Sequence, residues 1–283
     1  MIQEVEEGHA LDNSFRACEP GAADRVLHFS QGRCLVRATP GEGCDLVELP
    51  RLSDYRRRPQ STTYLFAMGP ERLFLALDDE VDADPDAGLS YEDMGWLRHV
   101  RPQHALFAAA TAAHLDRWYR ANRFCGRCGH PMELAPRSRE LVCPECCSIV
   151  YPKICPGVIC AVCHEADDPA DDAIVLTRYN GRTAALWALE GTVAREVMEE
   201  VGLRVCDLRF YKSQPWGFTD TLMAGFWCMV DGGTDIAVDH SELREARWFR
   251  RDEVPLERVG DRGSLTGEMI ERFRLMGREA WRS

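Results

Sequence analysis

Three glutamates in one short segment have the spacing of a metal-binding surface. Glu196, Glu199 and Glu200 lie at i, i+3 and i+4 in the string REVMEEVGL, residues 195–203, so a helix places all three on one face. Packed carboxylates repel one another unless cations neutralise them, and hard divalent ions such as Mg²⁺ or Mn²⁺ prefer oxygen ligands. Such ions would bridge the phosphates of a substrate and lower the pKa of an attacking water. A solvated acidic helix face is the simpler alternative, but the whole string is much harder to obtain by chance.

The neighbours of these glutamates also favour a helix. Arg195 can pair with one of the carboxylates and orient it. Val197 and Val201 are four residues apart and would face the core. Gly202 stands where a helix ends in a left-handed residue.

Four cysteines form a second group with metal-ligand spacing. Two C-x2-C pairs, Cys125/Cys128 and Cys143/Cys146, are separated by fourteen residues. Two such turns can hold one Zn²⁺ tetrahedrally with sulfur at about 2.3 Å, and four protein ligands make that site structural. Cys147 follows directly and could compete, but the register of the second pair favours Cys146. Four free buried cysteines with accidental spacing are the alternative.

A third cysteine pattern resembles a cofactor motif without supporting one. Cys160, Cys163 and His164 fit the C-x-x-C-H pattern of covalent haem attachment. They continue an apolar strand, however, where cysteine behaves as a small hydrophobe. We therefore predict buried strand residues and no haem.

The elements that must position these groups follow from hydrophobic periodicity. Residues 102–121 have apolar side chains at helical spacing, and this helix leads into the cysteine cluster. Further helices are predicted at about 192–201 and 267–278, and strands at 26–29, 64–68, 72–77, 157–162, 173–177, 208–211 and 222–230. Alternating strands and helices over the last 130 or so residues indicate a compact α/β sandwich. We expect three domains: a small mixed α+β domain at 1–120, a zinc ribbon at 121–152 and the sandwich at 153–283.

Composition narrows the function classes. The 283 residues are 45% hydrophobic and 28% charged, as in an ordinary globular protein, and carry a formal charge of −12. That charge argues against broad attraction to nucleic acid or anionic membranes. The acidic start of the chain lacks the features of a signal peptide, and no apolar run reaches membrane-span length. With thirteen cysteines, an odd number, we expect metal binding or free thiols in a cytoplasmic protein.

The carboxylate string resembles the second half of the Nudix signature, R-E-U-x-E-E-x-G-U, where U is aliphatic. A four-cysteine ribbon precedes it, and Ser213-Gln214-Pro215-Trp216-Gly217-Phe218 follows it. Together these features resemble the NADH pyrophosphatase branch, whose marker begins S-Q-P-W and continues x-F. The resemblance covers about residues 105–283. It implies a Nudix α/β/α sandwich, a homodimer, a structural Zn²⁺ and catalytic Mg²⁺ or Mn²⁺.

The resemblance also implies roles for individual residues. Glu196, Glu199 and Glu200 become metal ligands or the water-activating base, and Glu242 matches a distal carboxylate of the same metal site, although a surface glutamate is nearly as good an interpretation. The expected contacts with the substrate are Tyr151 after the ribbon and the stretch Gln214, Pro215, Trp216, Gly217, Phe218, Thr219, Asp220 and Thr221. The rings of Trp216 and Phe218 could stack on a flat base, and a core position is the alternative for Trp216.

The first half of the Nudix signature, G-x5-E-x7, does not match. Trp187 stands at its glutamate position, and Gly181 falls on its glycine without similar surroundings. The simplest explanation is a deletion of about ten residues before Glu190. In the family the missing loop supplies a backbone carbonyl to a metal, and a misplacement of about 1 Å can cost on the order of 100-fold in rate.

Three functions are consistent with the sequence. The leading hypothesis is metal-dependent hydrolysis of the diphosphate of NADH or NAD⁺ to nicotinamide mononucleotide and AMP, with NAD-capped RNA as a longer substrate. A catalytically weakened protein that binds or senses a dinucleotide is the alternative that the deletion suggests. A nucleic-acid-binding ribbon is the third, for which Arg123, Arg127, Arg137 and Arg139 offer a modest basic cluster.

Overall fold

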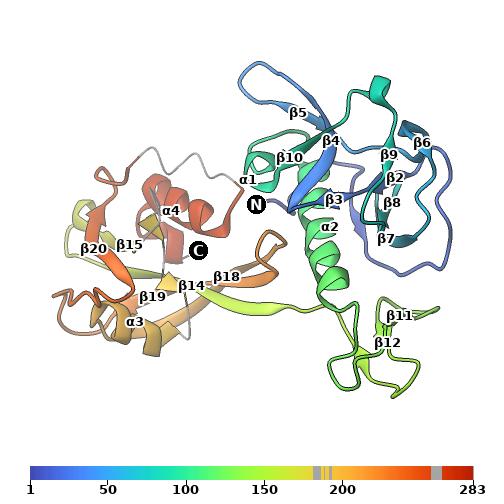
Figure 1. Ribbon diagram of the computed structural model, residues 1–283. Helices are drawn as coiled ribbons and strands as arrows, with labels where there is room; N and C mark the ends of the chain where they lie inside the picture. Colours follow the sequence, from blue (N-terminus) through green and yellow to red (C-terminus); the bar gives the residue numbers. More distant parts are fainter. Residues whose placement is uncertain (181–185, 188, 191–192, 256–262, 283) are drawn as a thin grey trace. The chain divides into compact units, whose positions relative to one another are not determined.

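The chain forms two compact units in the computed structural model, which describes residues 1–180, 186–187, 189–190, 193–255 and 263–282. The N-terminal unit comprises residues 2–154 together with 216–220, and the C-terminal unit comprises Met1, residues 155–215 and residues from 221 onward. Figure 1 labels the helices and strands of both units. The three-domain division at residues 120 and 152 stays a prediction.

The N-terminal unit consists of small antiparallel and mixed sheets packed around one long helix. One sheet has the order β1-β7-β8-β2, a second the order β10-β4-β3 with β5 beside β4, and β6 pairs with β9; a three-stranded sheet β11-β12-β13 follows the helix. The strands are β1 Leu11–Asp12, β2 Arg25–Leu27, β3 Phe29–Ser30, β4 Arg33–Thr39, β5 Leu46–Glu48, β6 Tyr55–Arg57, β7 Thr62–Met68, β8 Glu71–Ala76, β9 Asp82–Ala83, β10 Ser90–Asp93, β11 Glu133–Leu134, β12 Leu141–Val142 and β13 Ile149–Val150. The helices are α1 Met94–Leu97 and α2 Gln103–Ala121.

Helix α2 is the centre of this unit and confirms the helix predicted at 102–121. Its sequence is rich in alanine, the best helix former, and small side chains allow neighbours to pack closely around it. Leu106, Ala109 and Trp118 are among its many buried residues, and they join one continuous core with the strands β2, β4, β7 and β8. The predicted strands at 64–68 and 72–77 are β7 and β8, and the one at 26–29 overlaps β2.

The C-terminal unit is built on one mixed sheet with the strand order β16-β15-β14-β19-β18; β17 also pairs with β14, and β20 with β15. Strands β14 and β19 are parallel, whereas β15 pairs antiparallel with β14 and with β20. The strands are β14 Cys155–His164, β15 Ala173–Tyr179, β16 Leu186–Trp187, β17 Leu189–Glu190, β18 Val205–Trp216, β19 Thr221–Val230 and β20 Leu243–Arg250. The helices are α3 Val193–Val201, α4 Leu265–Met276 and α5 Glu279–Arg282.

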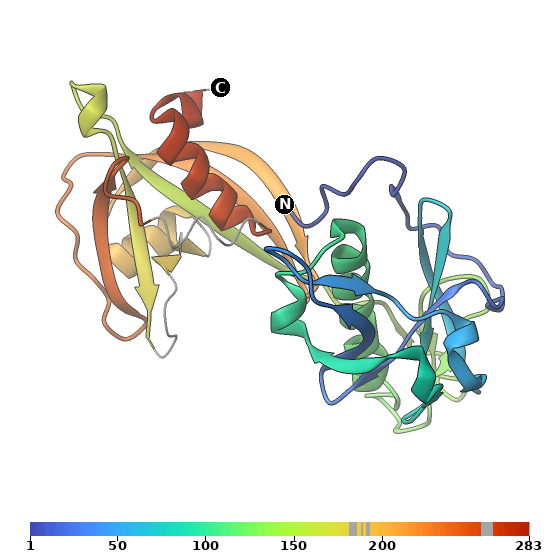
Figure 2. The ribbon, with the colours of Figure 1, turned by 90° about the horizontal axis from the view of Figure 1, so that it is seen from above.

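Helices cover both faces of this sheet, as Figure 2 shows for α3 and α4. Successive residues of β19 alternate between the two faces. Cys228 shares a core cluster with the valines of α3, whereas Gly225 faces α4, because a Cβ on this glycine would lie 3.0 Å from atoms of Leu265 and Met269. On that same face Trp227 packs against Trp281 of α5. The predicted α/β/α sandwich is therefore confirmed.

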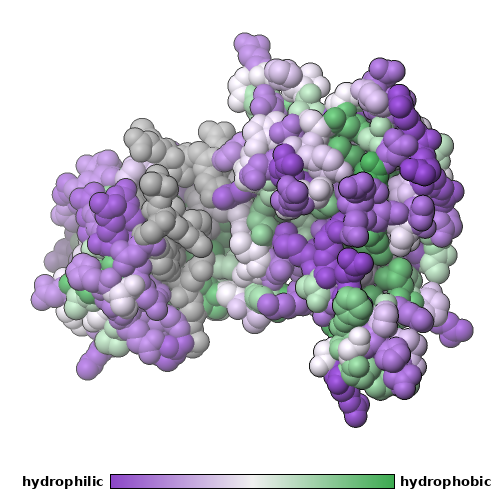
Figure 3. Space-filling model, in the orientation of Figure 1, coloured by the Kyte–Doolittle hydropathy of each residue, from purple (hydrophilic) through white to green (hydrophobic). Residues whose placement is uncertain are grey.

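Two further predictions concern the burial of Cys160 and Cys163 and the presence of membrane-spanning helices. Cys160 and Cys163 are almost completely buried in β14, which confirms them as interior strand residues. In the part of the chain that the structure describes, no helix is both long and apolar enough to cross a membrane. Figure 3 shows that hydrophilic residues cover much of the surface seen in this view.

Candidate metal centres and substrate site

Helix α3 carries the three glutamates, and one face of the helix is buried against the sheet. Val193, Val197 and Val201 recur every four residues and are buried against the sheet. Glu200 lies next to these valines and is only 4% exposed, whereas Glu199 is exposed and Glu196 half-buried. The helix therefore carries one carboxylate into the protein interior and two at its surface.

Arg195 contacts two of these carboxylates, where one contact was predicted. Its guanidinium donates to Glu196 and, at 2.5 Å, to Oε2 of Glu199. The same cation thus offsets the repulsion between these neighbouring carboxylates. Gly202 ends the helix with φ +70°, as predicted.

The end of α3 is tied to the segment that leads to Glu242. The amides of Ala237 and Asp239 donate to the carbonyls of Val201 and Glu200, each at 2.9 Å, and satisfy acceptors that a helix end leaves open. Glu242 follows, exposed, directly before β20. Backbone hydrogen bonds therefore connect the end of α3 to the segment that precedes Glu242.

The donor set of α3 fits a hard divalent cation, because it consists of carboxylates with one of them buried. Glu196 and Glu200 would hold the ion, with Glu242 as the distal ligand. In the described ranges, the groups whose ligand atoms converge within 4.8 Å are the four cysteines and Glu6, His9 and His104; the α3 carboxylates and Glu242 are not such a group. Much of the segment with the predicted deletion, 181–185, 188 and 191–192, lies outside the described residues, so this interpretation stays a prediction.

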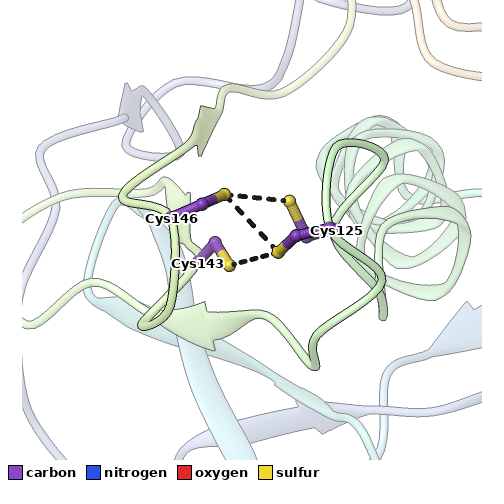
Figure 4. Close-up of side chains that lie close together, drawn as sticks. Cys125, Cys143 and Cys146 are labelled. Carbon is purple, nitrogen blue, oxygen red and sulfur yellow. Dashed lines mark hydrogen bonds between the residues drawn. The ribbon is translucent and has the colours of Figure 1, made fainter.

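The four predicted zinc ligands come together. Figure 4 shows their sulfur atoms converging from two turns. The Sγ–Sγ distances are 3.6 Å from Cys125 to Cys146, 3.4 Å from Cys128 to Cys143 and 3.5 Å from Cys128 to Cys146. Such spacing is that of four thiolates around one tetrahedral Zn²⁺.

The two cysteine turns have the same backbone pattern. In the first, Gly129 N donates to Cys125 O, and Cys125 N to His130 O; in the second, Cys147 N donates to Cys143 O, and Cys143 N to Ser148 O. The residue after each pair has a left-handed backbone, with φ +77° at Gly129 and +57° at Cys147. Cys147 is thus a turn residue whose thiol is exposed, which agrees with the choice of Cys146.

Backbone amides donate to one of these thiols. The N–H of Arg127 donates to Cys125 Sγ at 3.4 Å. This contact and a second one from the backbone of Cys128 lower the pKa of Cys125 to about 6, which favours the thiolate that binds zinc. All thirteen cysteines of the chain are free thiols in the structure.

The predicted nucleotide-binding stretch is divided between the two units. Gln214 belongs to the C-terminal unit, is 1% exposed, and uses both ends of its amide there. Its Nε2 donates to Gly263 O and its Oε1 accepts from Leu265 N, both at 2.7 Å. These bonds hold the start of α4. A contact between Gln214 and a nucleotide stays a prediction, as does one with its neighbour Pro215 or with Thr221.

Residues 216–220 pack within the N-terminal unit, on α2. Gly217 allows this close approach, since a Cβ there would lie 2.3 Å from Ala110 O. Arg117 donates to Gly217 O and, at 2.5 Å, to Oδ1 of Asp220. The loop is therefore fastened to α2 at two points.

The two aromatic rings of this loop are in contact with a cation. Trp216 and Phe218 lie 4.9 Å apart between ring centroids, and both are half-buried against the core. The Arg98 guanidinium lies 5.0 Å from the first ring and 5.8 Å from the second, a cation–π arrangement. Stacking of these rings on a substrate remains a prediction, as does a contact with the 63%-exposed Tyr151.

Two of the four arginines around the ribbon already have partners within the protein. Arg139 donates to Asn13 Oδ1 at 2.9 Å and to Leu65 O, so it anchors the ribbon segment to β7. Arg123 lies 3.6 Å from Asp79. The carboxylate and the internal contacts reduce the positive charge that a nucleic acid would meet here.

Sequence comparisons with known protein families and relatives agree with this description. Residues 120–151 match the model of the NADH pyrophosphatase zinc ribbon domain, and residues 185–267 match that of the NUDIX domain. Proteins named NAD-capped RNA hydrolase NudC from Salmonella heidelberg and Salmonella typhimurium are 41% and 40% identical over 192 residues, which are 63% of this chain and 71% of each relative. A solved NUDIX hydrolase from Nitrosomonas europaea, 20% identical, aligns with a TM-score of 0.42 over 56% of this chain and 93% of its own. The chain belongs to the Nudix hydrolase family, in the NADH pyrophosphatase branch.

Proposed function

We propose that this protein hydrolyses the diphosphate bond of NADH or NAD⁺ and releases nicotinamide mononucleotide and AMP. The observation that carries this proposal is the joint presence of the α3 carboxylates and the four-cysteine ribbon in one chain of this branch. Relatives of 40–41% identity named as NAD-capped RNA hydrolases support a capped RNA as a further substrate, because the same bond is cleaved. The dinucleotide-sensor alternative has no such support.

The carboxylates of α3 give the chain its part in the reaction. A bound Mg²⁺ or Mn²⁺ would supply charge stabilisation for the diphosphate and a water of lowered pKa. Glu196 and Glu200 would hold the ion, and the exposed Glu199 would accept the proton of the attacking water. Arg195 pairs with Glu196 and Glu199, so it positions both carboxylates.

Turnover of NADH with Mn²⁺ or Mg²⁺, with both mononucleotides measured as products, tests the proposal. We expect Glu199→Gln and Glu200→Gln to lower kcat/KM by about 100-fold or more, since each tenfold step corresponds to about 1.4 kcal/mol of transition-state stabilisation. Glu279→Gln, at an exposed glutamate of α5 in the same unit, is the matched control and should retain full rate. Wild-type turnover no faster than that of the two α3 variants would overturn the enzyme assignment. Binding of NADH without hydrolysis would then support the sensor.

We also propose Zn²⁺ in the ribbon, a cytoplasmic location and a homodimer. Thirteen free thiols are consistent with a reducing compartment. Strand β18 lies at the end of the strand order and leaves Leu208 and Phe210 exposed, at 45% and 61%, which a second copy would cover. Light scattering of the wild type and of Phe210→Asp tests the dimer.

A further inference from the structure

A cluster of two histidines and a glutamate lies in the N-terminal unit, on elements that the proposed hydrolysis does not use. Glu6 and His9 precede the first strand, and His104 is the second residue of α2. Each residue offers a ligand atom, and these atoms all lie within 4.8 Å of one another. Ligand atoms on one ion at about 2.1 Å can be at most about 4.2 Å apart, so these three atoms lie close to that limit before any side chain moves.

Glu6 is held in place by the start of α2. Its Oε1 accepts from Gln103 N at 2.6 Å, and its Oε2 accepts from His104 N at 3.0 Å. These amides belong to the first turn of the helix, whose N-cap Pro102 makes no side-chain bond, so Glu6 caps the helix from outside it. The carboxylate is therefore fixed before any ligand binds.

The carboxylate and one imidazole already have the spacing of neighbouring ligands. His104 Nδ1 lies 3.0 Å from Glu6 Oε2, and the two atoms share a hydrogen bond. Two ligands of one divalent ion, each bound at about 2.1 Å, are themselves about 3.0–3.4 Å apart. An ion replacing the proton of that hydrogen bond would leave both atoms close to their present positions.

His9 completes the cluster with an imidazole nitrogen that lacks a partner. Its Nδ1 is shielded from solvent and has no hydrogen bond to any described residue, which is a costly state for a polar atom. Its ring stacks on that of His104 with centroids 3.8 Å apart and an 8° interplanar angle. The ring must turn out of this stack to direct its lone pair at a shared ion, and its Nδ1 has no hydrogen bond to lose in doing so.

The backbone around His9 is also closely packed. Gly69, in the turn between β7 and β8, approaches Gly8 so closely that a Cβ would lie 1.9 Å from Gly8 O. Its amide donates to Ala10 O at 2.9 Å. His9 is thus carried on a segment anchored to a sheet and not on a loose terminus.

We propose that Glu6, His9 and His104 form a second transition-metal site that takes Zn²⁺ or a similar first-row divalent ion. Two imidazoles and a carboxylate are a donor set suited to such ions and less suited to Mg²⁺. The ion would join the N-terminal segment to the start of α2. Because these groups are brought together by folding, ion binding stabilises the folded N-terminal unit.

Copper(II) is a probe that distinguishes this site from the four-cysteine ribbon and from the α3 carboxylates. Protein with one Zn²⁺ per chain in its ribbon, and with its other exposed thiols alkylated so that they cannot reduce copper, receives one equivalent of Cu²⁺, and electron paramagnetic resonance counts the coordinated imidazole nitrogens. The carboxylates of α3 provide no nitrogen coupling. We expect two imidazoles in the wild type and displacement of Cu²⁺ by added Zn²⁺. In His9→Gln and His104→Gln we expect one imidazole, with Zn²⁺ affinity at this site lowered on the order of 100-fold.

His99→Gln is the matched control, since His99 is an exposed histidine of the same unit outside the cluster. It should keep both nitrogen couplings. Thermal unfolding in a chelator shows whether each variant folds, and Zn²⁺ should raise the unfolding temperature of the wild type more than that of His9→Gln. Identical copper spectra in the wild type and His9→Gln, or loss of the signal in His99→Gln, would overturn the proposal.

Discussion

Cys147 and Gly129 occupy the same position in the two turns of the ribbon, but only one of them suits that position. Both have a left-handed backbone, and both amides donate to the carbonyl of the first cysteine of their pair. A side chain in this conformation costs about 1–2 kcal/mol, whereas glycine adopts it freely. The register of the second pair favours Cys146 over Cys147 in the sequence, and the backbone conformation at Cys147 agrees with that choice.

Replacing Cys147 with glycine should therefore stabilise the N-terminal unit. We expect Cys147→Gly to raise the free energy of unfolding by about 0.5–1 kcal/mol, because relief of the left-handed strain exceeds the extra entropy of glycine in the unfolded chain. Denaturant unfolding measures this change, and elemental analysis should still find the ribbon Zn²⁺. Cys147→Ala is the control, since it removes the thiol and keeps the Cβ. Equal stabilisation by alanine would show that the thiol and not the backbone is responsible.

His28 makes the N-terminal unit sensitive to pH. It is fully buried, with Nδ1 2.6 Å from the Tyr91 hydroxyl and Nε2 3.0 Å from Asp78 O. Burial, helped by the positive charge of Arg120, holds the pKa of His28 below its ordinary value of 6.5. The unfolded chain then takes up this proton at higher pH than the folded chain does, so stability is fully present above pH 6.5 and falls as the pH drops through the folded-state pKa.

We expect His28→Gln to reduce this loss of stability toward acid, even if its stability at neutral pH is lower. The measurement is the free energy of unfolding of wild type and variant at several pH values from 7.5 to about 5, compared as slopes. His99→Gln, which changes an exposed histidine, should keep the wild-type slope. An unchanged slope in His28→Gln would assign the pH dependence to another group.

At the scale of elements, local sequence patterns predicted what depends on neighbours along the chain. The long helix, the carboxylate helix and the apolar strands of the sandwich follow from periodicity alone. Strand β20 was missed because arginines and a glutamate interrupt its apolar residues, although Phe249 is buried. Strand β4 was missed for a similar reason, since Arg33 and Arg37 flank its three buried residues.

The candidate sites divide in the same way. C-x2-C turns and an i, i+3, i+4 helix face are short-range patterns, so their residues could be named in advance. Glu6, His9 and His104 come together only because the terminal segment returns to the start of α2, and no spacing in the sequence signals this contact. The docking of Gly217 on α2 is likewise a contact between residues about a hundred positions apart.

That docking gives a prediction for the contact between loop and helix. We expect Gly217→Ala to destabilise the N-terminal unit by about 1–3 kcal/mol, because the added methyl group would overlap the backbone carbonyl of Ala110, which cannot move aside as a flexible side chain can. Thermal or denaturant unfolding of the full chain measures the loss. Gly126→Ala is the matched control, since nothing lies within 4 Å of its Cβ position. Stability equal to that of the control would mean that the loop is not closely packed on α2.

For the molecule as a whole, the charge balance limits how a capped RNA can be bound. Thirty-four basic residues face 46 acidic ones, which gives the formal charge of −12. Around the ribbon, Arg139 is used internally and Arg123 lies beside a carboxylate. Each neutralised phosphate of a single strand contributes about −0.7 to the slope of log affinity against log salt concentration. A protein with this net charge, and with these two arginines already paired, should therefore recognise the cap and little of the RNA behind it.

We accordingly expect the RNA body to add little to affinity and little to salt dependence. With inactive Glu199→Gln protein, which keeps both proposed metal ligands of α3, binding of NAD-capped RNA should have a log–log salt slope no more than about 1.5 units steeper than that of NAD⁺, equivalent to roughly two phosphate contacts. Titrations at several KCl concentrations and fixed Mn²⁺ provide both slopes, and the same RNA without its cap is the control for non-specific binding. An excess slope of about 3 or more units would require at least four phosphate contacts. It would show that the protein has a positively charged RNA-binding surface despite its negative net charge. If the excess slope is small, discrimination between capped RNA and free dinucleotide must arise in the groups that contact the NAD moiety, because the RNA backbone then contributes almost no binding energy of its own.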